Sequence, residues 1–184
     1  MENYDLSLLA SSGKDVYISK NVEIRRPNLV SIDSHVAIDS GFYLTTGAKI
    51  GSYIHISAYV TCIGGADAEL HLEDFTTIAA GARLIARGDE HLGAGLVGPT
   101  IPNLYKDKLV GGFIRIKKFA SVGTNAIIMP GITLNEGSVL GAGSLLTKDT
   151  EPWTIYVGTP AKAVKVRKKE NMIEFAKAIN QKNN

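Results

Sequence analysis

Apolar residues in this chain recur every six positions. The recurrent positions are Ile18, Ile24, Ile32, Ile38, Leu44, Ile50, Ile56, Cys62, Leu72, Ile78, Leu84, Ile116, Val122, Ile128, Leu134, Leu140 and Leu146. A second apolar or small side chain stands two residues before each, from Val16 to Ser144. In a strand, residues i−2 and i point to the same face. Since a period of six is neither the helical period nor plain strand alternation, it predicts short strands that alternate with turns, as in a parallel β-helix.

Three such six-residue units close one triangular coil, and the chain has room for about six coils. The inward aliphatic residues then fill a continuous column, whose burial at about 25 cal/mol per Å² is the main stabilising contribution. Glycines such as Gly41, Gly81 and Gly143 fall where corners need positive φ. The predicted fold class is therefore all-β, a parallel β-helix.

Three interruptions of the six-residue period fall at one corner of the predicted prism. The intervals are eight residues after Ile24, ten after Cys62 and thirty-two after Leu84. Loops that gather on one edge of a solenoid usually mark its binding side. The longest, residues 85–113, is too long for a simple connector, so we expect a functional arm.

The regular part of the chain, residues 16–146, is flanked by two ends. Residues 1–15 lack the period and are expected to form a cap. In the C-terminal segment 147–184, Trp153 and Tyr156 are expected over the open end of the column. Apolar residues in 168–180 form a helical stripe, which predicts a short amphipathic α-helix. We expect this helix to pack on a neighbouring subunit, with packing on its own chain as the alternative.

Composition excludes several classes. The 184 residues suit one domain, and a net charge of +2 from 20 basic and 18 acidic residues argues against nucleic acid or an anionic membrane as partner. No signal peptide and no apolar stretch long enough for a membrane span is visible, so a cytoplasmic location is expected. The one cysteine, Cys62, occupies an inward position, where a core role is expected.

The segment from Val122 to Lys165 carries a family resemblance. Its motifs are VGTN at 122–125, MPGIT at 129–133, GAGS at 141–144, LTKD at 146–149 and GTPAK at 158–162. Together with the six-residue period, these motifs resemble the hexapeptide-repeat acyltransferases, in particular the galactoside and maltose O-acetyltransferases. The resemblance implies a left-handed helix, a homotrimer, and transfer of an acyl group from acetyl-CoA to a sugar hydroxyl or amine. ARGDEH at 86–91 and GPTIPNLYK at 98–106 look most like acetyltransferases of surface-polysaccharide biosynthesis.

The same resemblance implies an acetyl-CoA site with six residues: Thr124, Ala142, Thr147, Lys148, Lys162 and Lys165. Small side chains leave room for the pantetheine arm, and lysines suit the phosphates of CoA. Two features of the galactoside branch are missing. Asp89 stands where that branch has its catalytic histidine, and the acceptor-binding asparagine of that branch falls near Thr61.

Four histidines compete for the role of general base: His35, His55, His71 and His91. We favour His55, because it precedes inward Ile56 and so points outward, and because YIHISAY at 53–59 resembles an element of the polysaccharide branch. His91, in the arm, is the second choice. Asp89 is expected to orient the base or bind the sugar, with Glu90 as its alternative.

These observations predict an acetyl-CoA-dependent O-acetyltransferase that acts on a sugar hydroxyl, without a metal, in surface-polysaccharide biosynthesis. The main alternative is an N-acetyltransferase of a nucleotide-linked amino sugar, which needs less help from a base. A β-helix carbonic anhydrase needs three zinc-binding histidines at one interface, and the histidine spacings of 20, 16 and 20 do not favour it. A non-catalytic scaffold would not bind CoA.

Overall fold

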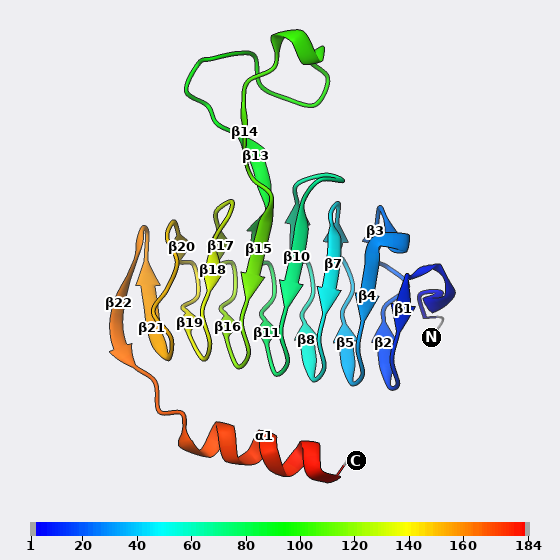
Figure 1. Ribbon diagram of the computed structural model, residues 1–184, viewed down its shortest axis with the longest axis vertical. Helices are drawn as coiled ribbons and strands as arrows, with labels where there is room; N and C mark the ends of the chain where they lie inside the picture. Colours follow the sequence, from blue (N-terminus) through cyan, green and yellow to red (C-terminus); the bar gives the residue numbers. More distant parts are fainter. Residues whose placement is uncertain (1–2, 183–184) are drawn as a thin grey trace.

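The computed structural model describes residues 3–182 as a three-sided parallel solenoid (Figure 1). Face one consists of β1 (Ser11–Ser12), β4 (Val30–Ile32), β7 (Gly47–Ile50), β10 (Glu69–Leu72), β15 (Phe113–Ile116) and β18 (Thr133–Leu134). Face two consists of β2 (Val16–Ile18), β5 (Val36–Ile38), β8 (Ile54–Ile56), β11 (Thr77–Ile78), β16 (Ser121–Val122), β19 (Val139–Leu140), β21 (Thr154–Gly158) and β22 (Ala161–Val166). Face three consists of β3 (Glu23–Ile24), β6 (Tyr43–Leu44), β9 (Thr61–Ile63), β12 (Arg83–Ile85), β17 (Ile127–Ile128) and β20 (Leu145–Leu146). The predicted all-β fold is confirmed: six coils are complete, and β21 begins a seventh.

The six-residue period forms the core. Every residue of the period, from Ile18 to Leu146, is buried. Like positions stack from coil to coil: on face three Leu44 pairs with Cys62, Cys62 with Leu84, and Leu84 with Ile128. The column is therefore continuous along the solenoid axis, and each coil covers the apolar residues of the next.

One of the buried hydroxyl groups of the core lacks a hydrogen-bond partner among the residues that the structure describes. Thr76 is fully buried, and its Oγ1 has no hydrogen-bond partner within residues 3–182. An unsatisfied buried polar group costs about 1–3 kcal/mol. We therefore expect Thr76→Val, which keeps the shape of the side chain, to raise the free energy of unfolding by about 1 kcal/mol, measured by urea denaturation at fixed protein concentration.

Thr46→Val is the matched control. Thr46 is equally buried, but its Oγ1 lies 3.7 Å from the Sγ of Cys62 and forms a weak hydrogen bond there. This substitution removes a bond, so no gain is expected. Equal gains in the two variants would show that the missing partner of Thr76 is not what destabilises the column.

The corner between faces one and two carries a column of stacked rings that the six-residue period did not predict. Neighbouring ring centroids lie 4.7–5.7 Å apart. All members have positive φ, a conformation that costs a non-glycine residue about 1–2 kcal/mol and that ring stacking here helps to offset. The members are His35, Tyr53, Phe75, Phe119 and Trp153.

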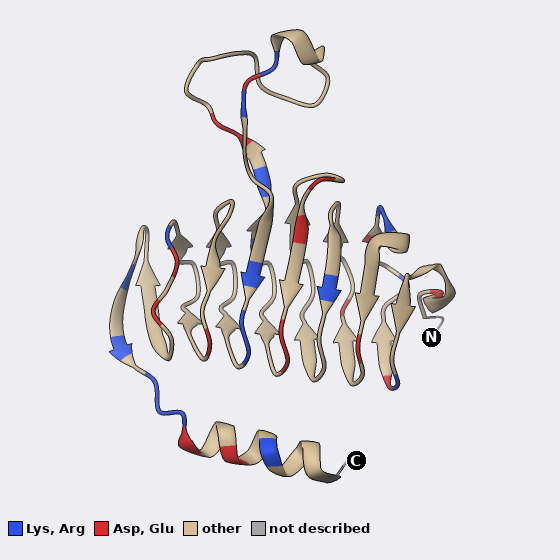
Figure 2. Ribbon diagram, in the orientation of Figure 1, with Lys and Arg blue, Asp and Glu red and all other residues tan. Residues whose placement is uncertain are grey.

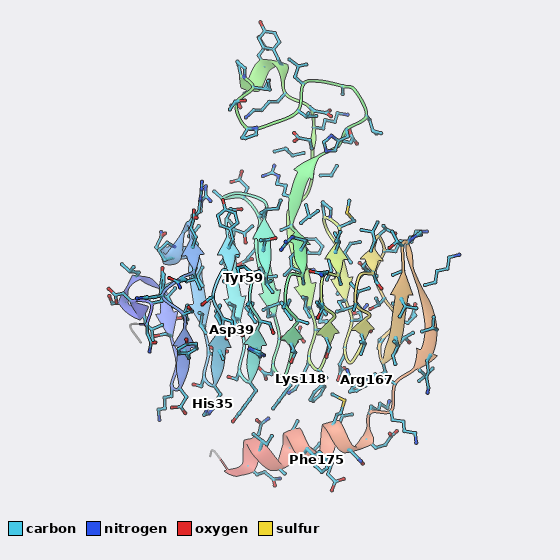
Figure 3. All side chains as sticks on the ribbon, turned by 180° about the vertical axis from the view of Figure 1, so that it is seen from behind. His35, Asp39, Tyr59, Lys118, Arg167 and Phe175 are labelled. Carbon is cyan, nitrogen blue, oxygen red and sulfur yellow. The ribbon has the colours of Figure 1, made fainter. Side chains whose placement is uncertain are left out.

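Helix α1 (Glu170–Lys182) lies along this aromatic corner. Ala176 is buried against Phe119 and Trp153, and Phe175 on the same helix is 62% exposed. Arg167, just before the helix, donates hydrogen bonds to the carbonyl oxygens of Phe119 and Gly137, and Figure 3 shows it at the edge above α1. The predicted amphipathic helix is thus present, and its buried face packs on its own chain; packing of its exposed face on a neighbouring subunit stays a prediction.

All three interruptions lie on the edge between faces three and one, as the period predicted. The first contains the 3-10 helix η2 (Pro27–Leu29), and the second connects β9 to β10. The third is the arm, which projects from the solenoid (Figure 1) on a two-stranded antiparallel stalk of β13 (Arg87–Asp89) and β14 (Leu109–Gly111). Its distal part contains the 3-10 helix η3 (Asn103–Tyr105).

The two ends differ in detail from the expectation. Within 1–15 the chain forms the 3-10 helix η1 (Leu6–Leu8) and then β1, which pairs with β4, so the first coil already begins in the segment expected as a cap. At the other end Tyr156 packs against the apolar column, whereas Trp153 belongs to the aromatic corner. Within residues 3–182, no helix has both the length and the apolar character needed to cross a bilayer.

Candidate active site

His55 forms a histidine–carboxylate pair on face two. It lies in β8 with its side chain outward, and its Nε2 is 3.0 Å from Oδ2 of Asp39, which follows β5 (Asp39 is labelled in Figure 3). Both side chains are about half exposed. A carboxylate on one ring nitrogen fixes the tautomer and leaves the other nitrogen available for a proton. The pair can therefore act as a general base.

Small side chains occupy the positions next to His55 in the same row of face two. Ala37 and Thr77 flank His55 on the neighbouring strands, and Ser121 follows Thr77 in the same row. The geometry allows a substrate, or an adjoining subunit, to approach His55 directly.

The arm has its own polar centre, the buried carboxylate of Asp107. Its oxygens accept hydrogen bonds from the backbone N–H of His91, at 2.9 Å, and of Lys108, at 2.8 Å. Asp107 is only 5% exposed although it lies on a projecting loop. It fixes the turn at His91, which has a positive φ of 62°. The arm is thus an organised element.

Asp89 lies at the end of the stalk strand β13 and is partly buried. Its backbone pairs with Leu109, and its carboxylate makes no hydrogen bond or ion pair within the described part of the chain. The stalk leaves from the edge between faces three and one, whereas His55 lies on face two. Within one chain the structure therefore does not bring Asp89 or His91 to His55, and the carboxylate that orients His55 is Asp39 rather than Asp89.

The six residues implied for acetyl-CoA are exposed on the last coils but do not form one cluster. Thr124 and Ala142 lie one coil apart at the corner between faces two and three, where the N–H of Gly143 donates to the carbonyl of Thr124. Lys162 and Lys165 lie on β22, which continues face two.

The other two residues of this set, Thr147 and Lys148, lie at the opposite edge of face three, directly after β20. One CoA molecule can therefore contact both edges only if it crosses face three or lies between two adjoining subunits.

The remaining titratable candidates have structural partners. His71 contacts Glu69, His35 contacts Asp15 and stacks on Tyr53, and no three His, Cys, Asp or Glu residues within 3–182 converge on a metal site. Burial raises the pKa of the Cys62 thiol to about 12, so Cys62 does not provide a thiolate nucleophile near neutral pH.

Asp39 was missed in the sequence, although a signal for it exists. The strand register pairs Ala37 with His55. Asp39 lies two residues after Ala37, at the corner that follows β5, and its carboxylate reaches the imidazole. Stacking the chain in eighteen-residue coils would have found this neighbour.

The comparisons with known proteins place this chain in a class. No family model matches it. The chain is 32% identical over 177 residues to a chloramphenicol acetyltransferase of Agrobacterium fabrum, covering 91% of this chain and 78% of the relative. The galactoside acetyltransferase–coenzyme A complex, with a TM-score of 0.61 and 19% identity over 90% of this chain and 69% of that chain, shares the fold. The chain belongs to the hexapeptide-repeat acyltransferases and is a CoA-dependent acyltransferase.

Two relatives are linked by name or by bound ligand to an amino sugar. The AntD N-acyltransferase of Bacillus cereus, solved with dTDP and 3-hydroxybutyryl-CoA, has a TM-score of 0.91 and 34% identity and covers 99% of this chain and 98% of its own. Variants of AntD have been solved with dTDP-4-amino-4,6-dideoxyglucose and coenzyme A. A dTDP-4-amino-4,6-dideoxy-D-glucose acyltransferase of Escherichia coli is 29% identical over 163 residues, which is 87% of this chain and 83% of the relative.

Proposed function

We propose that this protein transfers an acyl group from acyl-CoA to the amino group of a nucleotide-linked amino sugar. The observation that carries the proposal is the likeness to AntD over nearly the whole of both chains, arm included. These comparisons favour the N-acyltransferase alternative over the O-acetyltransferase expected from the sequence motifs. A dTDP-linked 4-amino-4,6-dideoxy sugar is the acceptor we propose, and a part in surface-polysaccharide biosynthesis stays a prediction.

The reaction requires one bond to form and one to break. The neutral amine attacks the thioester carbonyl, the C–N bond forms, the C–S bond breaks, and the nitrogen proton passes to the departing CoA thiolate. An amine is a good nucleophile without prior deprotonation, unlike a sugar hydroxyl. The enzyme must therefore hold the amine in its neutral form and direct it at the carbonyl.

Asp89 is the residue proposed to bind the amine. Its carboxylate is partly buried, lies at the base of the arm and has no partner within residues 3–182. A carboxylate there can accept a hydrogen bond from the amino group and relay the proton that is released. The CoA molecule is proposed to lie beside Thr124 and Ala142, with Lys162 and Lys165 near its phosphates.

We propose that the active unit is a homotrimer. The arm carries exposed apolar side chains far from the solenoid, including Leu92 (79% exposed), Leu96 (60%) and Leu104 (84%). Apolar residues gathered on a projection favour burial against another subunit. Such an arrangement would bring the arm of one subunit over the last coils of the next, and so Asp89 near CoA.

The test follows free thiol release from acetyl-CoA with two acceptors that differ at one atom. One is dTDP-4-amino-4,6-dideoxyglucose and the other is its analogue with a hydroxyl at carbon 4. We expect transfer to the amine only, and we expect His55→Ala to change kcat/KM by less than about threefold, because no strong base is needed. Mass spectrometry of the product identifies the acylated atom.

The opposite result would support the O-acetyltransferase. Transfer to the hydroxyl acceptor, lost about 100-fold or more in His55→Ala, would make the His55–Asp39 pair the catalytic base and remove the present proposal. Ser57→Ala, two residues from His55 and directly after β8, serves as the matched control for a local disturbance of this strand.

A further inference from the structure

A groove on face one contains a row of basic side chains beside the base of the arm. Lys49, His71 and Arg115 occupy equivalent positions on β7, β10 and β15, in register with one another. Figure 2 shows basic segments on β7 and β15 on either side of an acidic segment on β10. The three residues line a groove of about 690 Å³.

The charges in this row do not cancel. Glu69 contacts both Lys49, at 3.2 Å, and His71, at 2.5 Å. Burial alone would raise the pKa of Glu69, but its hydrogen bonds with His71 and Lys49 outweigh burial and lower the pKa. Arg115 has no carboxylate partner within residues 3–182. One carboxylate thus faces two permanent cations and a histidine, which leaves an excess of positive charge.

Arg115 is held in place by stacking. Its guanidinium carbon lies 4.3 Å from the centre of the Phe113 ring, while the outward strand position leaves its N–H groups accessible. A guanidinium held against a ring loses little freedom when it binds, and its paired N–H groups match the oxygens of a phosphate. These are the properties of an anion-binding residue.

The other end of the groove carries an excess of negative charge, because Asp33 lines it beside two ion pairs. Lys117 pairs with Glu73 at 2.9 Å, and Lys118 lies 3.7 Å from Asp74. An anion is therefore favoured only at the end near Arg115. That end adjoins the arm, because Phe113 is the last residue of the arm and the N–H of Glu69 donates to the carbonyl of Gly112.

We infer that this row binds the diphosphate of the nucleotide-linked acceptor, an inference that rests on the proposed function. Arg115 would hold one phosphate, and His71 with Lys49 would face the other, since neighbouring strands lie about 4.8 Å apart. The sugar attached to the diphosphate then points toward Asp89 at the base of the arm. CoA carries a diphosphate too, but the residues implied for CoA lie on the last coils and not on β7, β10 and β15.

The experiment measures equilibrium binding of dTDP and, separately, of CoA by titration calorimetry. It uses the full-length protein, Arg115→Gln and the matched control Arg25→Gln. Arg25 also lies over a ring, Tyr43, at 5.5 Å, but on face three, and Glu23 neutralises it. We expect Arg115→Gln to weaken dTDP binding about tenfold or more and to leave CoA binding unchanged, whereas Arg25→Gln changes neither.

Each other outcome decides against the site. Unchanged dTDP affinity in Arg115→Gln would overturn the site without touching the proposed function, which depends on wild-type transfer to the amino sugar. Weakened CoA binding alone would assign the groove to the donor. If the wild type does not bind dTDP but acylates other amines, both the site and the nucleotide-linked acceptor are wrong. Equal thermal unfolding midpoints for the three proteins exclude misfolding as the cause.

Discussion

Asp89→Asn should lower kcat/KM for acyl transfer to the amino sugar by about 100-fold or more, with little change in CoA affinity. The amide keeps the size of the side chain, but it cannot accept the proton that the amine releases, and such proton acceptors contribute about 10²–10⁴ in rate. The measurement is thiol release at saturating acetyl-CoA with varied dTDP-4-amino-4,6-dideoxyglucose. CoA binding is measured in parallel, to separate donor binding from chemistry.

Glu90→Gln provides the matched comparison for this prediction. Glu90 is the next residue, is also partly buried, and keeps the arm in place through its backbone N–H, which donates to Lys108. Its side-chain change should therefore alter kcat/KM only slightly. A large loss in Glu90→Gln with an active Asp89→Asn would transfer the role to Glu90, and activity in both variants would exclude the arm carboxylates from the chemistry.

The second large effect concerns stability. Leu84→Ala is expected to lower the free energy of unfolding by about 2–5 kcal/mol, because it opens a cavity in the apolar column. Leu84 is fully buried, with Cys62 and Ile128 above and below it in adjacent coils. Urea denaturation followed by circular dichroism, at one fixed protein concentration, measures the change.

Leu104→Ala makes the same chemical change on the arm, where the side chain is 84% exposed in the single chain. The free energy of unfolding of the chain should hardly change. If the two variants lose equal stability, the column is not the main source of stability. A loss of trimer in Leu104→Ala, detected by sedimentation, would instead support burial of the arm against a neighbour.

The six-residue period was sufficient to predict the solenoid because it repeats a local rule. Each inward side chain needs only its counterparts in adjacent coils, so the register of Leu44 on Cys62 follows from counting residues. The corner from which the arm leaves the solenoid was predicted in the same way, because the six-residue period continues on both sides of the insertion. The path of the chain within the arm was not, since it depends on the single buried carboxylate of Asp107 and its backbone partners.

Contacts between coils were harder to predict than the coils themselves. The stacked rings at the aromatic corner lie at irregular spacings in the sequence, from His35 to Tyr53 and from Phe75 to Phe119, because insertions separate some coils. Asp39 escaped notice beside His55 for a related reason: it belongs to another coil. The roles of His55, Asp89 and His91 stay predictions, because they depend on substrates and on how the subunits meet.

The attachment of the arm has a consequence for how such enzymes diversify. Gly112, at the exit of the arm, donates from its N–H to the carbonyl of Ala86, at the entrance, so the chain leaves and re-enters the solenoid at nearly one point. Strand β10 pairs directly with β15 as if nothing stood between them. The arm can therefore change in length and sequence without disturbing the folding of the coils. Relatives can therefore differ in their arms while the stacked coils stay the same.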